Sequence, residues 1–257
     1  MAAKPKPMVA IDLFAGAGRT DLQLDDRPER TGEWRDGVGR VAGAGAPPPA
    51  GLGAFADAVA RANPAGGLRW YPGSPLIALD FLRPEDRLVA VELHPEEHAL
   101  LAERLQTDPR ARAVREDGWR ALKALTPPTP RRGLLLVDPP FEVRDEEARM
   151  LAALADATRR WPVGVQIWWR PVKDLAAAEA FDSAAAERLG GHPALSARLC
   201  VKTPQPGAPG LPGSALLIVN PPFGLEASLA EIGPHLAERL AQGPGADWRL
   251  ARLAETG

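Results

Sequence analysis

Two short segments of this chain have the residue types and the spacing of a group-transfer site. Residues 11–18, Ile-Asp-Leu-Phe-Ala-Gly-Ala-Gly, run from an apolar stretch into a Gly-x-Gly turn. Gly16 and Gly18 lack side chains, so the backbone N–H groups of the turn can approach a bound cofactor at the carboxyl end of a strand. We therefore interpret Gly16 and Gly18 as cofactor-binding residues.

The second segment, Asp138-Pro139-Pro140-Phe141, follows the apolar run Leu135-Leu136-Val137. The Asp138 carboxylate and the Pro139 carbonyl can accept hydrogen bonds from a flat amino-bearing group, and Phe141 can stack on its face. The two prolines make the turn rigid and fix the acceptors in advance. Taken in this order, the two segments resemble motifs I and IV of the S-adenosylmethionine (SAM) dependent amino methyltransferases.

This resemblance implies methyl transfer to an exocyclic nitrogen such as N6 of adenine, which is a poor nucleophile because its lone pair is delocalised into the ring. Acceptors at Asp138 and Pro139 would hold both N–H bonds, favour a pyramidal nitrogen and direct its lone pair at the methyl group of SAM. Stacking on Phe141, worth roughly 1–3 kcal/mol, would offset part of the cost of unstacking the base. Asp138, Pro139 and Phe141 are the predicted catalytic residues.

A similar string, Asn220-Pro221-Pro222-Phe223, occurs late in the chain. In an open α/β sheet, ligands bind beyond the carboxyl ends of the parallel strands. Asp138 ends a strand that we expect beside the first, whereas Asn220 ends a strand that we expect to run antiparallel. Because Asn220 would then lie on the far side of the sheet, we predict that Asp138 belongs to the catalytic copy.

Two further positions could contact the cofactor. Glu92 closes the run Leu88-Val89-Ala90-Val91, where its carboxylate could accept both hydroxyls of a ribose. Asp117-Gly118 follows the next expected strand, where the acid could accept from an adenine amino group and the glycine would leave room for the ring. The alternatives are a surface acid at Glu92 and an ordinary turn or helix start at Asp117-Gly118.

The elements that must position these residues alternate as βα units, which predicts a mostly parallel sheet. The expected strands are Met8–Leu13, Leu88–Glu92, Ala111–Arg115, Leu134–Asp138, Gly164–Trp169, Ala194–Val201 and Ser214–Asn220. The expected helices are Ser74–Leu82, His94–Gln106, Gly118–Leu125, Asp145–Trp161, Lys173–Leu189 and Leu225–Ala241. Seven strands in this order match the class I methyltransferase fold, a Rossmann-like α/β sheet whose last strand is antiparallel.

Residues 20–71 do not fit the alternation, being rich in Gly and Pro with short helical pieces. We interpret them as an inserted helical subdomain within a methyltransferase domain formed by residues 1–19 and 72–257. A ribose-binding acid normally follows the glycine turn by about 20 residues. Glu92 has that position only when the insertion is removed.

Composition sets the remaining expectations for this chain of 257 residues. The single Cys200 cannot form an internal disulfide, which favours the reducing cytoplasm, and no stretch approaches the ~18 apolar residues of a membrane span. His94, His98, His192 and His235 form no ligand cluster, so we expect no metal. A formal net charge of −2 gives no global basic field, and RNA contacts would need local patches.

One candidate patch comprises Arg110, Arg112, Arg115, Arg120, Lys123, Arg131 and Arg132, which could equally be a solvated face. Trp168-Trp169 ends the fifth expected strand. One of these rings could line the substrate pocket, whereas at least one of them is expected in the core.

The chain as a whole is similar to one family, the bacterial RlmJ-type methyltransferases, which methylate N6 of an adenosine in 23S ribosomal RNA. Beyond the motifs above, the resemblance rests on five strings, of which that beginning at Tyr71 is the most distinctive. They are Arg30-Thr31-Gly32-Glu33, Tyr71-Pro72-Gly73-Ser74-Pro75-Leu76-Ile77-Ala78, Glu92-Leu93-His94-Pro95, Arg131-Arg132-Gly133-Leu134 and Asn220-Pro221-Pro222.

The family's SAM contacts would fall on Ser74, Glu92, Asp117, Gly118 and Asp138, with Asp138 also catalytic. The resemblance further implies a monomer acting on 23S RNA that is protein-free or early in assembly, with the insertion contacting RNA. Family members begin with a further segment that helps to close the cofactor site, whereas this chain starts at the first strand.

Phe14 stands where the family usually has a histidine, and Phe141 where tyrosine is common. Phe141 keeps the stacking face, whereas Phe14 cannot replace the hydrogen bonds of an imidazole. The expected consequence is weaker SAM binding.

Two alternatives remain. The same motif serves adenine-N6 methylation of DNA and methylation of protein glutamine. The chain could also be an N-terminally truncated, catalytically weak RNA-binding remnant.

Overall fold

The central feature of the computed structural model is an eight-stranded sheet with the order β10-β8-β9-β7-β6-β1-β4-β5. The structure describes residues 6–24, 32–43, 51–143, 145–208 and 210–254. The sheet strands are β1 (Val9–Asp12), β4 (Arg87–Val91), β5 (Ala111–Val114), β6 (Gly133–Val137), β7 (Val165–Pro171), β8 (Ala194–Cys200), β9 (Gly213–Val219) and β10 (Asp247–Ala254). A separate antiparallel pair is formed by β2 (Arg19–Asp21) and β3 (Trp70–Pro72).

The parallel strands of the sheet all end on the same side, so the turns that follow them lie close together. β1 pairs in parallel with β4 and β6, and the parallel arrangement continues to β5 and β7. β9 is antiparallel to both β7 and β8, and β10 is antiparallel to β8. All four residues of β1 are buried, as expected for a central strand covered on both faces.

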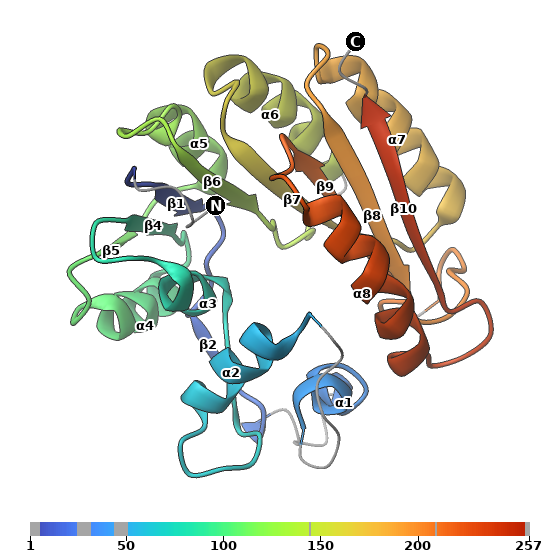
Figure 1. Cartoon of the computed structure of the whole chain (residues 1–257), viewed down its shortest axis with the longest axis horizontal. Helices are drawn as coiled ribbons and strands as arrows, with labels where there is room; N and C mark the ends of the chain where they lie inside the picture. Colours follow the sequence, from blue (N-terminus) through green and yellow to red (C-terminus); the bar gives the residue numbers. More distant parts are fainter. Residues whose placement is uncertain (1–5, 25–31, 44–50, 144, 209, 255–257) are drawn as a thin grey trace.

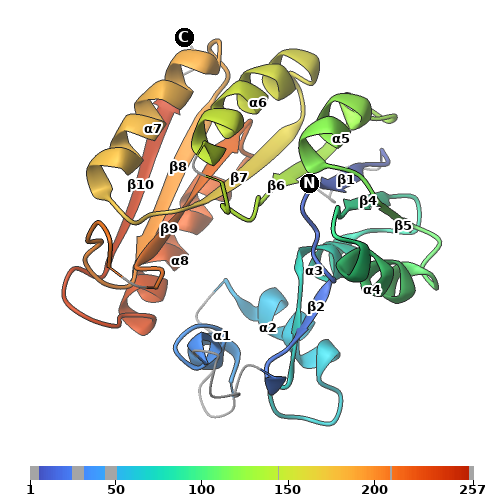
Figure 2. The same ribbon diagram turned by 180° about the vertical axis from the view of Figure 1, so that it is seen from behind.

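Helices cover both faces of the sheet (Figure 1). On one face lie α3 (Ser74–Phe81), α4 (Pro95–Leu105) and α8 (Leu225–Arg239). On the other, seen in Figure 2, lie α5 (Gly118–Leu125), α6 (Glu146–Arg160) and α7 (Leu175–Arg188). The larger apolar core joins α5, α6 and α7 to the sheet, and a smaller one joins α3 and α4 to β1 and β4.

These elements confirm the predicted class I methyltransferase fold, including its small helical insertion. Each of the six predicted helices and seven predicted strands is present, with ends that agree to within two residues. The predicted count of seven strands was one too few, because β10 adds an eighth strand at the β8 edge. Trp248 of β10 packs against α8 at Gly233, where a Cβ would come within 2.0 Å of the indole ring.

The insertion begins beyond the carboxyl end of β1 and returns through β3 into α3 (Figure 1). It contains the 3-10 helix η2 (Glu33–Arg35) and the helices α1 (Val38–Ala42) and α2 (Gly53–Ala62). Asn63 ends α2: its side-chain amide donates to the Val59 and Trp70 carbonyls, and its oxygen accepts from the N–H groups of Arg69 and Trp70. Arg40 donates to the Ala241 carbonyl at 2.7 Å, which joins α1 to the end of α8.

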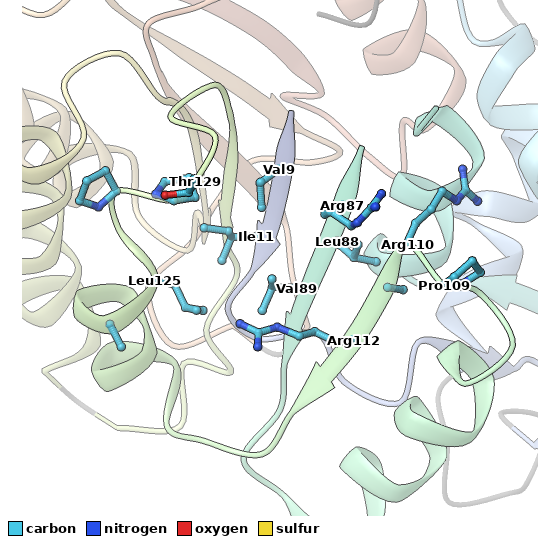
Figure 3. Close-up of a pocket in the computed structure, with 14 residues that line it drawn as sticks. Val9, Ile11, Arg87, Leu88, Val89, Pro109, Arg110, Arg112, Leu125 and Thr129 are labelled. Atoms are coloured by element: carbon cyan, nitrogen blue, oxygen red, sulfur yellow. The ribbon is translucent and has the colours of Figure 1, made fainter. Parts of the chain in front are cut away.

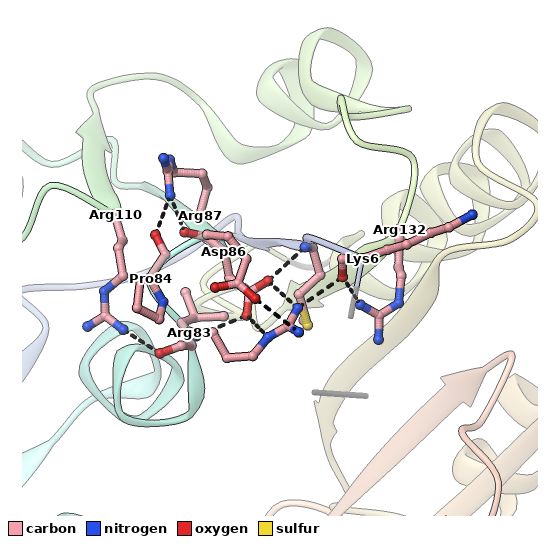
Figure 4. A network of polar contacts seen from close by, with 10 residues as sticks. Lys6, Arg83, Pro84, Asp86, Arg87, Arg110 and Arg132 are labelled. Carbon is pink, nitrogen blue, oxygen red and sulfur yellow. Dashed lines mark hydrogen bonds and ion pairs between the residues drawn. The ribbon is translucent and has the colours of Figure 1, made fainter. Parts of the chain in front are cut away.

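A buried ion pair fixes the opposite edge of the sheet, where β1 and β4 begin (Figure 4). The Asp86 side chain is fully buried and accepts from the backbone N–H of Met8 at 2.8 Å. It also accepts from the backbone N–H of Arg83 at 2.9 Å and from its guanidinium at 2.8 and 2.9 Å. These donors lower the pKa of Asp86 to about 2, with the Arg83 side chain as the largest cause.

Candidate active site

A cavity of about 930 Å³ opens at the edge where the parallel strands end. Its size is within the range of about 300–1,000 Å³ that is typical of small-molecule pockets. Gly16, Glu92, Asp117, Gly118 and Asp138, all predicted site residues, line it. They come from turns after four adjacent strands, β1, β4, β5 and β6, as expected for ligand binding beyond the carboxyl ends of a parallel sheet.

Glu92 connects the glycine turn to the end of β4. Its two carboxylate oxygens accept from the backbone N–H of Gly16 at 2.9 Å and of His94 at 2.7 Å. Gly16 has a φ of 55°, which favours glycine. The geometry fixes Glu92 at the cavity wall, and a carboxylate has further lone pairs that could accept from the hydroxyls of a ligand.

Gly18, the other predicted cofactor-binding glycine, is buried and does not line the cavity. Its φ is 78°, and its carbonyl accepts from the N–H of Gly73 at 2.8 Å. An added Cβ would meet Leu101 at 3.1 Å. The positive φ and the packing of Leu101 account for this glycine, whereas Gly73 is the residue that lets the chain after β3 pass close to the turn, since a Cβ there would meet the Gly18 backbone at 3.0 Å.

Two carboxylates at the carboxyl ends of the parallel strands, Asp12 and Asp138, have raised pKa values. Asp12, at the end of β1, is 3% exposed and accepts from the Ser74 hydroxyl at 2.6 Å. Burial raises the pKa of Asp12 to about 6, and the charge of Glu92 adds to this shift. Burial also raises the pKa of Asp138 to about 6, with the charge of Asp12 as the second cause. Asp138, unlike Asp12, is exposed to solvent at the cavity wall.

Gly118 begins α5, and the structure shows why this position is a glycine. A Cβ there would come within 2.5 Å of the Leu13 carbonyl oxygen and 2.6 Å of the Phe14 ring. Asp117 precedes it as the helix N-cap and accepts from the N–H of Arg120 at 2.9 Å. The close approach of β1 and Phe14 therefore accounts for the glycine, where the sequence suggested room for an adenine ring.

The Asp138 turn places one aromatic residue at the entrance of the site. Phe141 has a φ of 52°, and its ring packs edge to face on Trp169 with centroids 5.8 Å apart. Trp168, on the opposite face of β7, is 1% exposed and belongs to the core. Thus one tryptophan of the pair is structural, and the other contacts the predicted stacking residue. Pro139 is buried and, like Phe141, does not line the cavity itself.

The Asn220-Pro221-Pro222-Phe223 string lies where the parallel strands begin, opposite the cavity, as predicted from the antiparallel direction of its strand. The Asn220 side chain donates to the carbonyls of Pro162 at 2.9 Å and Gly164 at 2.8 Å, before β7 begins. Asn220 has a φ of 52°, and Phe223 is fully exposed. These bonds give Asn220 a structural role in the turn that precedes β7.

Besides Phe14, which was singled out from the sequence, the cavity is lined by Trp119, Glu146 and Arg149, which were not predicted. Phe14 packs edge to face on Trp119 at 5.0 Å, and the Trp119 indole donates to Glu146 at 3.0 Å. The Arg149 guanidinium lies 5.7 Å from the Trp119 ring. For Asp12, the available signal was an acid at the end of the first apolar strand, beside the glycine turn.

The predicted basic patch is not one surface. Arg115 follows β5 and lines the cavity, whereas Arg110 and Arg131-Arg132 precede β5 and β6 at the opposite edge. Two other members of the group lie on α5 and are ion-paired, Arg120 with Glu116 at 3.7 Å and Lys123 with Asp156 at 3.7 Å.

Within the described ranges, three or more His, Cys, Asp or Glu side chains nowhere gather as metal ligands would. Among these same residues, no helix has the length and apolar character needed to cross a membrane.

The sheet order, with its antiparallel β9, and the cavity at the carboxyl ends define the class of Rossmann-like α/β methyltransferases. Residues 5–252 match the family model described as "Ribosomal RNA large subunit methyltransferase D, RlmJ". The chain therefore belongs to the RlmJ family of methyltransferases.

Individual relatives agree with this family. The chain is 37% identical to ribosomal RNA large subunit methyltransferase J of Escherichia coli over 92% of its length and 83% of the relative. It is 31% identical to the Haemophilus influenzae protein of the same name, over 96% of this chain and 87% of that one. The crystal structure of protein LPL1258 from Legionella pneumophila superposes with a TM-score of 0.85 at 26% identity, covering 96% of this chain and 89% of that one.

Proposed function

We propose that this enzyme transfers a methyl group from SAM to N6 of an adenosine in 23S ribosomal RNA. The observation that carries the proposal is the position of Asp138, which ends β6 and faces the same cavity as Glu92. An acceptor for an amine and an acceptor for a cofactor thus share one site. The relatives' names support large-subunit ribosomal RNA as the substrate.

The residues of the cavity fit the donor and acceptor groups of SAM. Glu92 presents a fixed carboxylate to ribose hydroxyls, and Asp117 offers a further acceptor at the wall. Gly16 contributes turn backbone, and Ser74 acts from behind by holding Asp12. When bound, SAM supplies an electrophilic methyl group that needs no metal.

Asp138 and the Pro139 carbonyl would accept the two N–H bonds of the adenine amino group and so hold its nitrogen in position. The Asp138 carboxylate is too weak a base to take a proton from the neutral amine, so the proton leaves after methyl transfer. Phe141, braced by Trp169, would stack on the base once it has left its helix or loop. The remaining groups of the site serve binding and orientation.

The same proposal includes the partner and its surroundings. The insertion would contact RNA, since α1 and α2 lie beyond the carboxyl edge of the sheet (Figure 1). The substrate would be RNA that is protein-free or early in assembly, and the enzyme would act as a cytoplasmic monomer. Sedimentation of the protein with and without 23S RNA would establish both stoichiometries.

The decisive experiment offers labelled SAM with matched pools of protein-free 23S RNA, duplex DNA and release factor, followed by digestion of the labelled product to nucleosides or amino acids. We expect label only in RNA, as N6-methyladenosine. Label only in DNA or in protein glutamine would replace the RNA proposal by one of those alternatives.

Asp138→Ala tests the role of Asp138 by removing its hydrogen-bond acceptor. It should abolish turnover, a loss of several kcal/mol in barrier stabilisation by analogy with other positioned groups. The melting temperature should not fall, because the raised pKa of Asp138 means that its charged form opposes folding. Near wild-type turnover in this variant would remove Asp138 from the mechanism.

A further inference from the structure

A second hollow, of about 410 Å³, lies on the α5 face of β1, β4 and β5, away from the candidate active site (Figure 3). Its floor is formed by the apolar side chains of Val9, Ile11 and Val89, and one wall by Leu125 and the loop after it. α5 has only eight residues, or about 12 Å of helix. The three floor side chains are buried, and the accessible surface of the hollow is formed by half-buried Leu125 and exposed Pro127.

The charged residues that line the hollow all have the same sign. They are Arg87, Arg110 and Arg112, and none of the lining residues is acidic. Arg110 is ion-paired with Asp108 at 2.6 Å, and Arg87 donates to the carbonyls of Pro84 and Asp86 at 2.9 and 2.7 Å. The hollow therefore combines an apolar floor with a positively charged margin.

Arg112 differs from the other two arginines. Within the part of the chain that the structure describes, its guanidinium has neither a hydrogen bond nor an ion pair. Its strand register places it beside Val89, which in turn lies beside Ile11, and Figure 3 shows the side chain extending over this apolar row. An exposed guanidinium over an apolar floor can bind an anion that also carries a flat or apolar group.

Arg112 is also connected to the candidate active site through β5, an edge strand of the sheet. Arg115, which follows the same strand, lines the cavity that contains Asp138. Three residues of strand span about 10 Å. An extended polyanion that passes along the β5 edge could therefore reach both arginines.

We propose that this hollow is a second contact site for the RNA substrate, which rests on the proposed function. Arg112 binds a backbone phosphate, and Leu125 and Pro127, above the buried floor, receive the attached base or ribose. A nucleotide fits both features of the hollow, since it joins an anion to a flat ring. The site would recognise RNA that extends from the cavity along β5, and it would not contact the reacting atoms.

The test compares Arg112→Gln with Arg252→Gln, which removes one charge from the opposite edge strand. Arg252 lies on β10, where it is ion-paired with Glu226 at 2.8 Å, and it is far from both sites in the sheet order. Binding of protein-free 23S RNA is measured by filter retention at several salt concentrations, independently of methyl transfer.

Arg112→Gln should weaken 23S RNA binding by about three- to tenfold and lower the log–log salt slope by about 0.7, as expected for one lost phosphate contact. Binding of a short fragment around the modified adenosine should weaken less. Arg252→Gln should leave the 23S RNA affinity unchanged. Equal effects of the two substitutions, or equal losses for both RNAs, would overturn the proposal.

A second variant tests the hollow instead of the charge. Ala124→Trp places a large ring at the exposed end of α5 that borders the hollow, and Ala180→Trp makes the same change on the exposed face of α7. Only Ala124→Trp should weaken 23S RNA binding, with both proteins melting as cooperatively as the wild type. No difference between them would exclude RNA from the hollow.

The outcomes separate this proposal from the proposed function. If wild-type protein binds 23S RNA but methylates only another substrate, the proposed function fails while the Arg112 effect on RNA binding can still be read. If methylation of RNA is confirmed and Arg112→Gln matches its control, only the second site fails. An acidic peptide that competes with RNA at Arg112 would indicate a protein partner and also overturn the proposal.

Discussion

At the scale of single residues, the paired carboxylates Asp12 and Asp138 dominate the chemistry of the candidate site. Each has a pKa raised to about 6, chiefly by burial, and the charge of Asp12 contributes to the shift of Asp138. Asp138 accepts its N–H bond of the amine most strongly when it is ionised, and the Pro139 carbonyl accepts the other. The protonation state of Asp12 therefore affects the pKa of Asp138.

The first prediction concerns pH. Turnover should fall as the pH drops through about 6, because protonated Asp138 loses acceptor capacity. Asp12→Asn removes a negative neighbour and should shift this acidic limb to lower pH. The measurement is kcat against pH at saturating substrates. An acidic limb that stays in place in Asp12→Asn would exclude this coupling.

The second prediction concerns the Asn220 turn. Asn220→Ala should leave turnover almost intact, because the side chain bonds to the chain before β7 on the opposite edge. It should lower the free energy of unfolding by about 2–3 kcal/mol, since two carbonyls lose their donor and Ala tolerates a positive φ less well than Asn. Urea unfolding and a turnover assay check the two parts. A large loss of rate in a stable protein would give Asn220 a catalytic role instead.

The sequence was enough to predict that Asp138 and Glu92 lie at one cavity. Asp138 and Glu92 end apolar strands, and the order of the strands is enough to bring them to one edge. The cavity wall made by Phe14 and Trp119 depends on a contact between the ends of β1 and α5, which no spacing along the chain reveals. For the same reason, the close approach of Leu13 and Phe14 to Gly118 could not be predicted from the sequence.

At the scale of elements, the Asp86 pair shows how a turn can hold two strands. Asp86 precedes β4, and its carboxylate binds both Arg83 and the backbone at the start of β1 (Figure 4). The pKa of Asp86 is lowered to about 2 from 3.8, so the charged form favours the folded state. This difference corresponds to about 2 kcal/mol of stability.

The third prediction follows from the sign of that shift. The contribution of Asp86 is complete above pH 3.8 and is lost as the pH falls through about 2. Asp86→Asn should therefore lower the free energy of unfolding by about 2–4 kcal/mol at pH 7, because Arg83 and the Met8 N–H lose a charged partner. The difference between variant and wild type should shrink in acid. Denaturant unfolding at neutral pH and near pH 2 measures it, and a constant difference would contradict the linkage.

β10 was not predicted, because a strand is recognised in a sequence by alternating apolar and polar residues. Its sequence, Asp-Trp-Arg-Leu-Ala-Arg-Leu-Ala, has Arg249 and Arg252 on opposite faces, so the alternation of apolar and polar residues is broken. Its position depends on Trp248 fitting against Gly233 of α8. That fit joins two consecutive elements and could not be predicted from either of them alone.

At the scale of the whole molecule, cofactor binding should couple to stability. The fourth prediction is that SAM at a hundredfold excess over its Kd raises the free energy of unfolding by about 2.7 kcal/mol, or the melting temperature by roughly 5–10 °C. Glu92→Gln should give a smaller rise at the same SAM concentration, because Glu92 is the fixed acceptor at the wall. Differential scanning calorimetry measures both. No shift at millimolar SAM would favour the RNA-binding remnant.

The parallel arrangement of β1, β4, β5, β6 and β7 was predictable, because βα units with short turns leave few possible arrangements. The insertion was predictable only as a break in the pattern. Its path depends on contacts such as Arg40 with the end of α8, which join segments about 200 residues apart. The RNA contacts proposed for it remain a prediction from the resemblance.

The β2–β3 pair has a consequence for how this protein can change. The inserted segment leaves and re-enters through neighbouring strands, and the pairing extends to a bond from the Leu22 N–H to the Arg69 carbonyl at 2.7 Å. Because β2 and β3 are paired, the chain between them leaves and returns at one fixed position. Its length and composition can drift, or be exchanged by design, without displacing the Asp12–Ser74 contact behind it. Substrate choice could therefore evolve separately from the catalytic edge.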